Sequence, residues 1–290
     1  MEKAILNKLK ERSTTVSGPD GNPLAVLSLS ERDSLCRYFR LSPREVELHS
    51  LEAGIVPLRY LRNIGTLSIE GQRRLLSSKV AVVGLGGLGG LLVELLARVG
   101  VGGMLIIDGD RFAEDNLNRQ ILLHERGISL VKARLAQQRV RDINSAIEVE
   151  RWEGFVTEEN ALHLLSSANL VCDALDNISS RLLLQSTCEQ LNISLVHGAV
   201  AGFSGQVTSI FPGDASLSII YEEKGMAVER GTEVEEGILS GAVGMVASLQ
   251  AQEVVKILTG KGAALRKTLL VIDTERGEIR RINLQQEEKT

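Results

Sequence analysis

Three glycines at a characteristic spacing follow an apolar run near residue 80. The run Val80–Val83 leads into Gly84-Leu-Gly86-Gly-Leu-Gly89, and a long apolar stretch begins at Leu91. Glycines spaced in this way let the chain turn sharply out of a strand, bring backbone N–H groups close to a phosphate and pack the next helix against the sheet. The phosphate would lie at the helix N-terminus, where unpaired N–H groups favour anions. The spacing therefore predicts a nucleotide site.

Acidic and amide side chains follow the next apolar segment. Asp108 ends this segment about 20 residues after the last glycine, where dinucleotide-binding folds place an acid on a ribose hydroxyl. By itself this pattern is typical of an NAD-dependent dehydrogenase. A nicotinamide ring needs an apolar slot, however, and the residues that come next are polar: Asp110, Asn116, Arg119 and Gln120. Carboxylates and amides suit a hard cation or a ribose and arginine suits phosphate oxygens, so this set indicates a triphosphate with a metal ion.

Apolar segments alternate with helical patterns in the middle of the chain. Strands are expected near 80–83, 104–108, 147–152, 170–176 and 194–198, and helices after the glycine turn and at about 130–143, 158–166 and 180–191. This alternation predicts an α/β fold with a Rossmann-like, doubly wound, mostly parallel sheet. The later segments 205–212, 269–273 and 279–284 are typical of antiparallel strands, which predicts an antiparallel C-terminal edge. A mobile loop is expected at about 213–240 and an apolar helix at 241–258.

Residues 1–52 are expected to form a helical N-terminal extension, and residues 53–290 the main domain. Ser42-Pro-Arg-Glu45 has the residues of a helix start, with a serine cap, a proline at the first position and a glutamate three residues after the serine. The sequence does not indicate what the extension does. A compact helical addition is the simpler interpretation, and a module that docks a partner is the alternative.

Length and composition limit the classes of protein further. A chain of 290 residues leaves room for one α/β domain with extensions, and a formal charge of −4 gives no basic surface for nucleic acid. No window reaches about 18 uninterrupted apolar residues and the N-terminus lacks the apolar core of a signal peptide, so we expect a cytoplasmic protein without membrane association. The three cysteines form no C-x-x-C pair, so we expect buried free thiols.

Four polar motifs, in their order and spacing, resemble the MoeB/ThiF/HesA family of ubiquitin-activating-enzyme-like adenylyltransferases. The motifs are Gly84-Leu-Gly-Gly-Leu-Gly89, Asp108-Gly-Asp110, Asn116-x-x-Arg119-Gln120 and Asp176-Asn177-x-x-x-Arg181. A glycine fingerprint alone is weak, whereas four motifs at matching separations are specific. The resemblance implies ATP-dependent adenylylation of the C-terminal glycine of a small ubiquitin-like sulfur-carrier protein, as in thiamine or molybdopterin synthesis. It also implies ATP and Mg²⁺ as cofactors and a homodimer with shared sites.

The resemblance assigns roles to matching positions. Asp176 would bind Mg²⁺, Arg119 and Lys132 would hold the phosphates, and Arg62 would reach into the partner subunit's site. The remaining nucleotide-binding residues would be Gly84, Gly86, Gly89, Asp108, Asp110, Asn116, Gln120 and Asn177. The alternative for Asp110, Lys132 and Arg181 is that they are solvated charges at helix ends or in loops. His197 is expected to be a satisfied core or rim histidine rather than a catalyst.

The chain departs from the family's pattern at three places. The first position of a paired C-x-x-C zinc motif reads Ser218-Ile-Ile-Tyr-Glu-Glu223 here and the C-terminus has no cysteine, so we expect no zinc. The stretch Gly231–Gly237, where relatives often have a thioester or persulfide cysteine, has none, so the reaction is expected to stop at the acyl-adenylate. Ser129 replaces the glycine that usually precedes Lys132.

Three other functions remain open from the sequence. An NAD-dependent oxidoreductase shares the glycine turn but leaves Asn116, Arg119 and Asp176 unexplained. ATP-dependent activation of another acceptor, a peptide or a tRNA base, fits the same motifs, and the lack of a basic surface disfavours tRNA. A non-catalytic scaffold is disfavoured because the polar motifs are intact.

Overall fold

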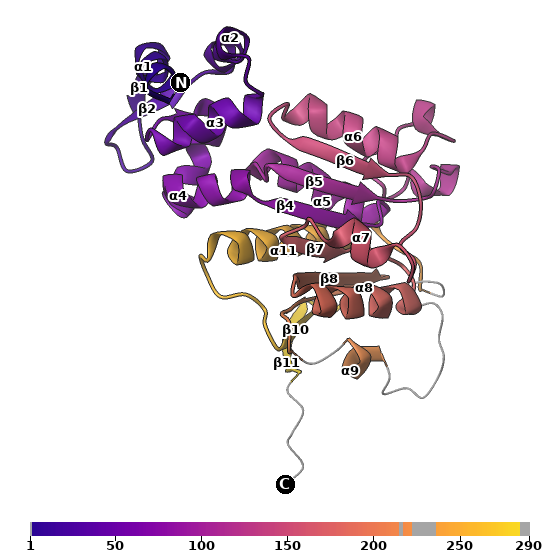
Figure 1. The fold of residues 1–290 in the computed structure, drawn as a ribbon. Coiled ribbons are helices and arrows are strands. Elements are labelled where there is room, and N and C mark those ends of the chain that lie inside the picture. Colours follow the sequence, from indigo (N-terminus) through magenta and orange to yellow (C-terminus); the bar gives the residue numbers. More distant parts are fainter. Residues whose placement is uncertain (1, 215–216, 222–235, 285–290) are drawn as a thin grey trace.

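The computed structural model describes residues 2–214, 217–221 and 236–284. An eight-stranded sheet lies at its centre (Figure 1). Its strand order is β11 (Glu278–Asn283), β10 (Thr268–Asp273), β9 (Ser204–Ile210), β8 (Ser194–Ala201), β7 (Leu170–Asp173), β4 (Lys79–Val83), β5 (Gly103–Ile107) and β6 (Glu148–Trp152). The strands β6, β5, β4, β7 and β8 are parallel to one another, whereas the pairs β8–β9, β9–β10 and β10–β11 are antiparallel. The predicted mostly parallel sheet with an antiparallel C-terminal edge is confirmed.

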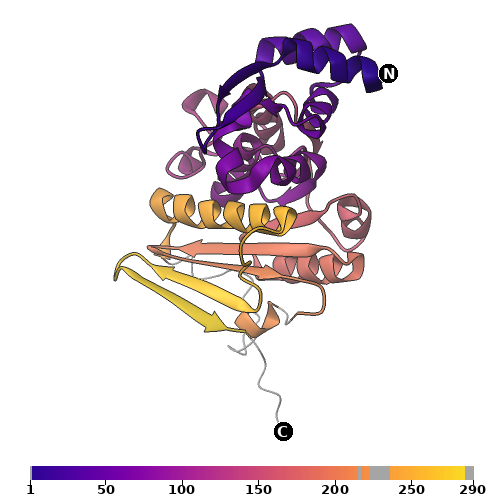
Figure 2. The same cartoon turned by 90° about the vertical axis from the view of Figure 1, so that its left-hand side faces the viewer.

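Helices cover both faces of this sheet (Figure 2). One face is covered by α4 (Ile64–Ser77), α5 (Gly87–Val99), α6 (Lys132–Ile143) and α11 (Ser240–Thr259), and the other by α7 (Ala161–Leu165), α8 (Ile178–Leu191) and the short α9 (Ser218–Tyr221). Val80 and Val82 of β4 belong to the first core, and Ala81 and Val83 to the second. Alternate side chains of a strand point to opposite faces, so a continuous apolar strand is what a sheet buried on both faces requires.

The order of the strands reverses between β4 and β7. The chain builds outward from β4 through β5 to β6, then returns to add β7 on the other side of β4. In open α/β sheets, ligands bind outside the carboxyl ends of the strands at this point of reversal. The glycine turn follows β4 directly, so the topology places it at the expected site.

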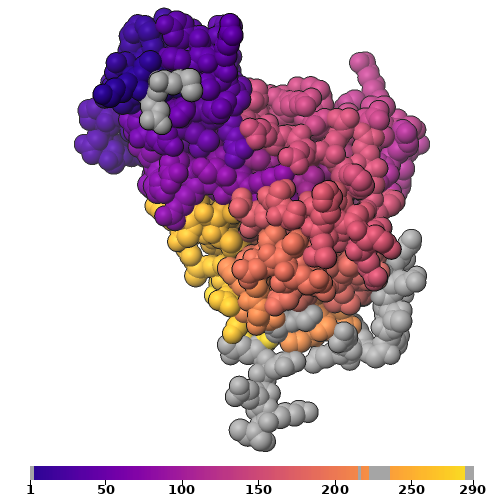
Figure 3. All heavy atoms as spheres, in the orientation of Figure 1, coloured from indigo at the N-terminus to yellow at the C-terminus, as the bar shows by residue number. Residues whose placement is uncertain are grey.

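The N-terminal residues form a small layer of their own at one end of the molecule (Figure 3). It contains α1 (Glu2–Arg12), β1 (Thr14–Ser17), β2 (Pro23–Leu27), α2 (Leu29–Phe39), α3 (Pro43–Glu52) and β3 (Val56–Pro57). The expected helices are present, and Ser42 and Glu45 form the predicted capping box. The hairpin β1–β2 and its pairing with β3 were not expected, because these strands are too short for their alternation to stand out in the sequence. The boundary at residue 52 stays a prediction.

A 3-10 helix, η1 (Leu58–Asn63), joins this layer to α4. In the part of the chain that the structure describes, no helix has both the length and the apolar character needed to cross a membrane. Cys172 and Cys188 are buried and Cys36 is half-buried, and all three are free thiols. Most of the expected mobile loop lies outside the described residues.

Candidate functional site

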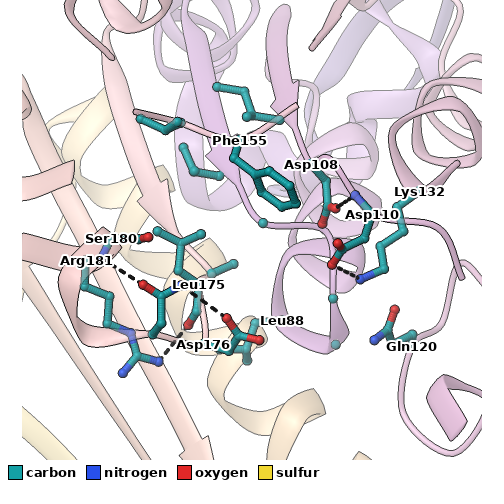
Figure 4. Close-up of a pocket in the computed structure, with 18 of the residues that line it drawn as sticks. Leu88, Asp108, Asp110, Gln120, Lys132, Phe155, Leu175, Asp176, Ser180 and Arg181 are labelled. Atoms are coloured by element: carbon teal, nitrogen blue, oxygen red, sulfur yellow. Dashed lines mark hydrogen bonds and ion pairs between the residues drawn. The ribbon is translucent and has the colours of Figure 1, made fainter. Parts of the chain in front are cut away.

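The glycine turn forms one wall of a pocket at the carboxyl ends of β4, β5 and β7 (Figure 4). Gly84 has a φ of +90°, and a Cβ at this position would lie 2.6 Å from the carbonyl oxygen of Ala174. A Cβ at Gly89 would lie 1.8 Å from the carbonyl oxygen of Gly84. No side chain caps the N-terminus of α5 at Gly86, so N–H groups of its first turn are left for a ligand. The turn therefore brings bare backbone donors to the pocket.

Asp108 fixes this turn from the end of β5. Its Oδ2 accepts a hydrogen bond from the backbone N–H of Leu85 at 2.6 Å, and its Oδ1 accepts one from Asp110 at 2.7 Å. Burial raises the pKa of Asp108, and the Lys132 ammonium and the two backbone donors oppose that shift. Asp108 also lines the pocket, so the same side chain can hold the glycine turn in place and contact a bound ligand.

Cationic and amide side chains line the pocket beside Asp110 and the glycine turn (Figure 4). The Lys132 side chain is 9% exposed and its Nζ lies 3.0 Å from Oδ2 of Asp110. Arg119 donates to the carbonyl oxygen of Asp115 at 2.9 Å. The Gln120 side chain is buried at the pocket, and its Oε1 has no hydrogen-bond partner among the described residues. Lys132 is thus not a solvated charge, and the buried Gln120 oxygen has a hydrogen-bonding capacity that no described residue satisfies.

The Asp176-Asn177 turn lies on the third side. Asp176 is exposed and lines the pocket, whereas the Asn177 side chain caps α8 by accepting from the N–H of Ser180 at 2.9 Å. Arg181 lines the same wall and is 3% exposed. The alternative in which Arg181 is a solvated charge is therefore wrong.

Three predicted site residues do not line the pocket. Gly89 lies behind the turn, where only a glycine fits. Asn116 is buried, and its Oδ1 accepts from the N–H of Ala113 at 3.2 Å, so it shapes the loop that carries Arg119. Arg62 is exposed on η1, away from this pocket. Sequence spacing identified the loop that contains Asn116 but not the direction of its side chain.

One apolar part of the lining was not predicted from the sequence. It comes from the segment after β6 and from the C-terminal half of the chain, and consists of Phe155, Val156, Val200, Ile238 and Val243. Phe155 is 62% exposed, and a Cβ at Gly109 would lie 2.7 Å from its ring. An isolated aromatic residue in a polar loop gives no periodic signal. Its place just after a strand of the parallel sheet was the one available indication.

A buried polar group lies behind the Asp176 turn. His197 Nδ1 and Asp173 Oδ2 are 2.6 Å apart, and both side chains are completely buried. Burial lowers the pKa of His197, and Asp173 opposes that shift. The expectation that His197 is a satisfied core histidine agrees with this geometry.

The residues at the pocket fit a nucleotide with Mg²⁺. The uncapped helix N-terminus, Lys132 and Arg119 suit phosphates, and the unpartnered Gln120 oxygen shows that the lining is incomplete on its own. The described residues include no group of three or more His, Cys, Asp or Glu placed to hold a metal ion. Mg²⁺ ordinarily uses one or two carboxylates with substrate phosphates, so the exposed Asp176 satisfies the protein's part of such a site.

Comparison with known proteins agrees with this fold. Residues 60–290 match the ThiF family. The SAMP-activating enzyme E1 of Haloferax volcanii is 38% identical over 74% of this chain and 80% of its own length. Protein HesA, heterocyst, of Trichormus variabilis is 34% identical over 82% of this chain and 85% of its own. Adenylyltransferase and sulfurtransferase MOCS3-1 of Zea mays is 34% identical, and this chain spans about half its length (51%).

Solved structures share the fold at lower identity. Escherichia coli MccB with ATP has a TM-score of 0.69 and 18% identity, over 90% of this chain and 80% of that one. PaaA has a TM-score of 0.68 and 20% identity, over 78% and 82%. Fold and sequence together define an adenylyltransferase. The chain belongs to the ThiF family of ubiquitin-activating-like enzymes.

Proposed function

We propose that this chain uses ATP to adenylylate the C-terminal glycine of a small ubiquitin-like sulfur-carrier protein. The carrier's carboxylate oxygen would attack the α-phosphorus, the bond to the β-phosphate oxygen would break, and pyrophosphate would leave. One observation supports the proposal most strongly. The uncapped N–H groups at the start of α5, the cations Arg119 and Lys132 and the exposed carboxylate of Asp176 all lie at one pocket. The carrier's carboxylate and the ATP phosphates are both anionic, so the reaction needs groups that neutralise and position them, and this set of residues supplies such groups.

Each side of the pocket would take one part of ATP. The first turn of α5, Arg119 and Lys132 would hold the phosphates, and Lys132 would exchange Asp110 for a phosphate oxygen. Asp108 would bind the ribose, and Phe155 offers an exposed apolar face for the base. Asp176, assisted by Asp110, would hold Mg²⁺, which screens phosphate charge when bound.

The cysteines support a reaction that ends at the acyl-adenylate. None of the three lines the pocket. Burial raises the pKa of Cys188 to about 12 and raises that of Cys172 as well, so neither is a ready thiolate. Sulfur transfer would then fall to another protein. Gly231–Gly237, where relatives have a loop cysteine, extends beyond the described residues.

The acceptor is assigned from the relatives. The Haloferax protein is named for activating SAMP, and the maize protein for adenylyltransferase and sulfurtransferase activity. A peptide or a tRNA base is the alternative acceptor, since the same ATP-binding motifs would serve its activation. An NAD-dependent oxidoreductase is not retained, since the chain belongs to an adenylyltransferase family.

The proposal is tested by ATP–pyrophosphate exchange. Ubiquitin-like proteins from the source organism that end in glycine should support exchange, and the same proteins without their terminal glycines should not. Asp176→Asn should lower exchange by about 100-fold or more, while Asp142→Asn on the exposed end of α6 should not. Exchange that persists with Asp176→Asn would remove the role given to that carboxylate.

The role of Arg62 requires a homodimer, which also belongs to this proposal. Arg62→Ala and Asp176→Asn should each be inactive alone. Subunits mixed at random should regain about one quarter of wild-type sites, since half of the dimers are mixed and each contains one intact site. Mixtures that stay inactive would mean that Arg62 does not serve a partner's site.

A further inference from the structure

Five polar side chains from five elements meet behind the Asp176 turn. They are Asp173 of β7, Arg181 of α8, His197 of β8, Gln206 of β9 and Tyr221 of α9. The Tyr221 hydroxyl lies 3.0 Å from His197 Nε2, 3.0 Å from Arg181 Nη1 and 3.1 Å from Gln206 Nε2. The Arg181 guanidinium also lies 5.5 Å from the centre of the Tyr221 ring. The proposed adenylation chemistry does not use this group.

The donors of the cluster determine where its protons lie. Arg181 and Gln206 carry only N–H groups at these positions, so the Tyr221 oxygen accepts from both. Its own proton is then directed to His197 Nε2. These contacts fit a neutral His197 with its proton on Nδ1, which donates to Oδ2 of Asp173.

This network fixes the backbone N–H and the backbone carbonyl of Leu175, a residue that lines the pocket. Oδ1 of Asp173 accepts from the backbone N–H of Leu175 at 3.0 Å. Arg181 Nη2 donates to the backbone carbonyl of Leu175 at 2.7 Å. Leu175 lines the pocket and immediately precedes Asp176 (Figure 4). The backbone on the N-terminal side of Asp176 is thus fixed by Asp173, which is completely buried, and by Arg181, whose position depends in turn on Tyr221.

We propose that Tyr221 and His197 are positioning residues for the Asp176 carboxylate, acting through Arg181 and Asp173 on the Leu175 backbone. The inference rests on the assignment of Asp176 to Mg²⁺ in the proposed function. Groups that orient a metal-binding carboxylate from behind ordinarily change metal affinity or activity about 10- to 100-fold when they are removed.

Tyr221→Phe tests this directly, because it removes one hydroxyl and keeps the ring. Calorimetry would measure binding of the α,β-methylene analogue of ATP with Mg²⁺ and with EDTA. The affinity in EDTA should equal that of the wild type, while the gain in affinity produced by Mg²⁺ should shrink about 10-fold or more. Tyr38→Phe, at a tyrosine that is 70% exposed, is the matched control and should change neither value.

The dependence on Asp176 is tested in the double variant. If Tyr221 acts through that carboxylate, adding Tyr221→Phe to Asp176→Asn should cause no further loss. Additive losses, or an equal loss of affinity in EDTA, would overturn the proposal. No acyl acceptor is needed, so a failure to find a carrier would leave this test intact. An unchanged response to Mg²⁺ in Asp176→Asn would instead refute the metal assignment.

A spectroscopic measurement on the wild type does not depend on how the variants fold. The protein has four histidines, so imidazole ¹⁵N spectra can be assigned with single His→Gln variants. His197 should be the neutral Nδ1–H tautomer at neutral pH, and Tyr221→Phe should shift its Nε2 signal. An Nε2–H tautomer or a charged imidazolium would contradict the network.

Discussion

Asp108 shows how one side chain serves the fold and the ligand together. Both of its oxygens accept backbone hydrogen bonds, one of them from the glycine turn itself. We expect Asp108→Asn to weaken MgATP binding about 10- to 100-fold, because an amide nitrogen would face one of those N–H donors and leave it unpaired. Calorimetry checks this, with Asp142→Asn as the control. Unchanged affinity would mean that Asp108 does not organise the nucleotide site.

The sequence was informative at this scale wherever a residue type was needed for backbone geometry or charge. Gly84, Gly86, Asp108, Lys132 and Asp176 were predicted from motifs, and all line the pocket. The direction of Asn116 and the contribution of Phe155 were not predictable, because a motif fixes the spacing of residues along the chain but not where a loop side chain points. The Asp173–His197–Tyr221 network was also missed, since its members lie on different elements.

At the scale of elements, the packing of α5 against the glycine turn sets the geometry of the phosphate site. Gly89→Ala would place a methyl group 1.8 Å from the backbone oxygen of Gly84, and backbone cannot move aside as a flexible side chain can. We expect a loss of about 3 kcal/mol or more in the free energy of unfolding, measured by urea denaturation.

A helical glycine without close neighbours provides the contrast. A Cβ at Gly244 of α11 would meet no atom within 4 Å. Gly244→Ala should therefore raise the free energy of unfolding by about 0.5 to 1 kcal/mol, since alanine favours a helix. If both variants changed stability alike, the close approach at Gly89 would not be what requires a glycine.

At the scale of the whole molecule, Arg32 belongs to a buried ion pair inside the N-terminal layer and also reaches the main sheet domain through a hydrogen bond. Arg32 Nη1 donates to Glu47 Oε1 at 3.0 Å, and its Nη2 donates to Ser145 Oγ at 2.8 Å. We expect Arg32→Ala to cost about 3 to 5 kcal/mol in urea denaturation, because the buried Glu47 would lose its main partner. Arg12→Ala breaks an exposed pair with Glu31 and should cost less than about 1 kcal/mol. A loss of stability in Arg32→Ala no larger than the loss in Arg12→Ala would show that the buried contacts of Arg32 do not stabilise the fold.

Stability of the whole chain should also depend on His197. Burial lowers its pKa below the ordinary value of 6.5, so below that pH the unfolded chain binds a proton that the folded chain does not. The contribution is complete above pH 6.5 and is lost as the pH falls, by at most about 1.4 kcal/mol per pH unit. Urea denaturation from pH 5 to 7.5 should show a shallower slope in His197→Gln, whereas the exposed His163→Gln should match the wild type. Equal slopes in all three would mean that His197 titrates normally.

The parallel strands, the glycine turn and the antiparallel C-terminal edge were predictable because each follows from a local pattern. The N-terminal hairpin was not, because its short strands are stabilised by tertiary pairing with β3. The link through Arg32 joins residues 113 positions apart, a contact that no local pattern reveals.

The central claim is that the pocket activates a carrier's terminal carboxylate with ATP, and pyrophosphate exchange measures that step most directly. The account predicts MgATP-dependent exchange that requires a ubiquitin-like protein with its terminal glycine intact and disappears with Asp176→Asn. Exchange that proceeds equally well with a carrier lacking that glycine, or no exchange with any glycine-terminated carrier although MgATP binds, would contradict it.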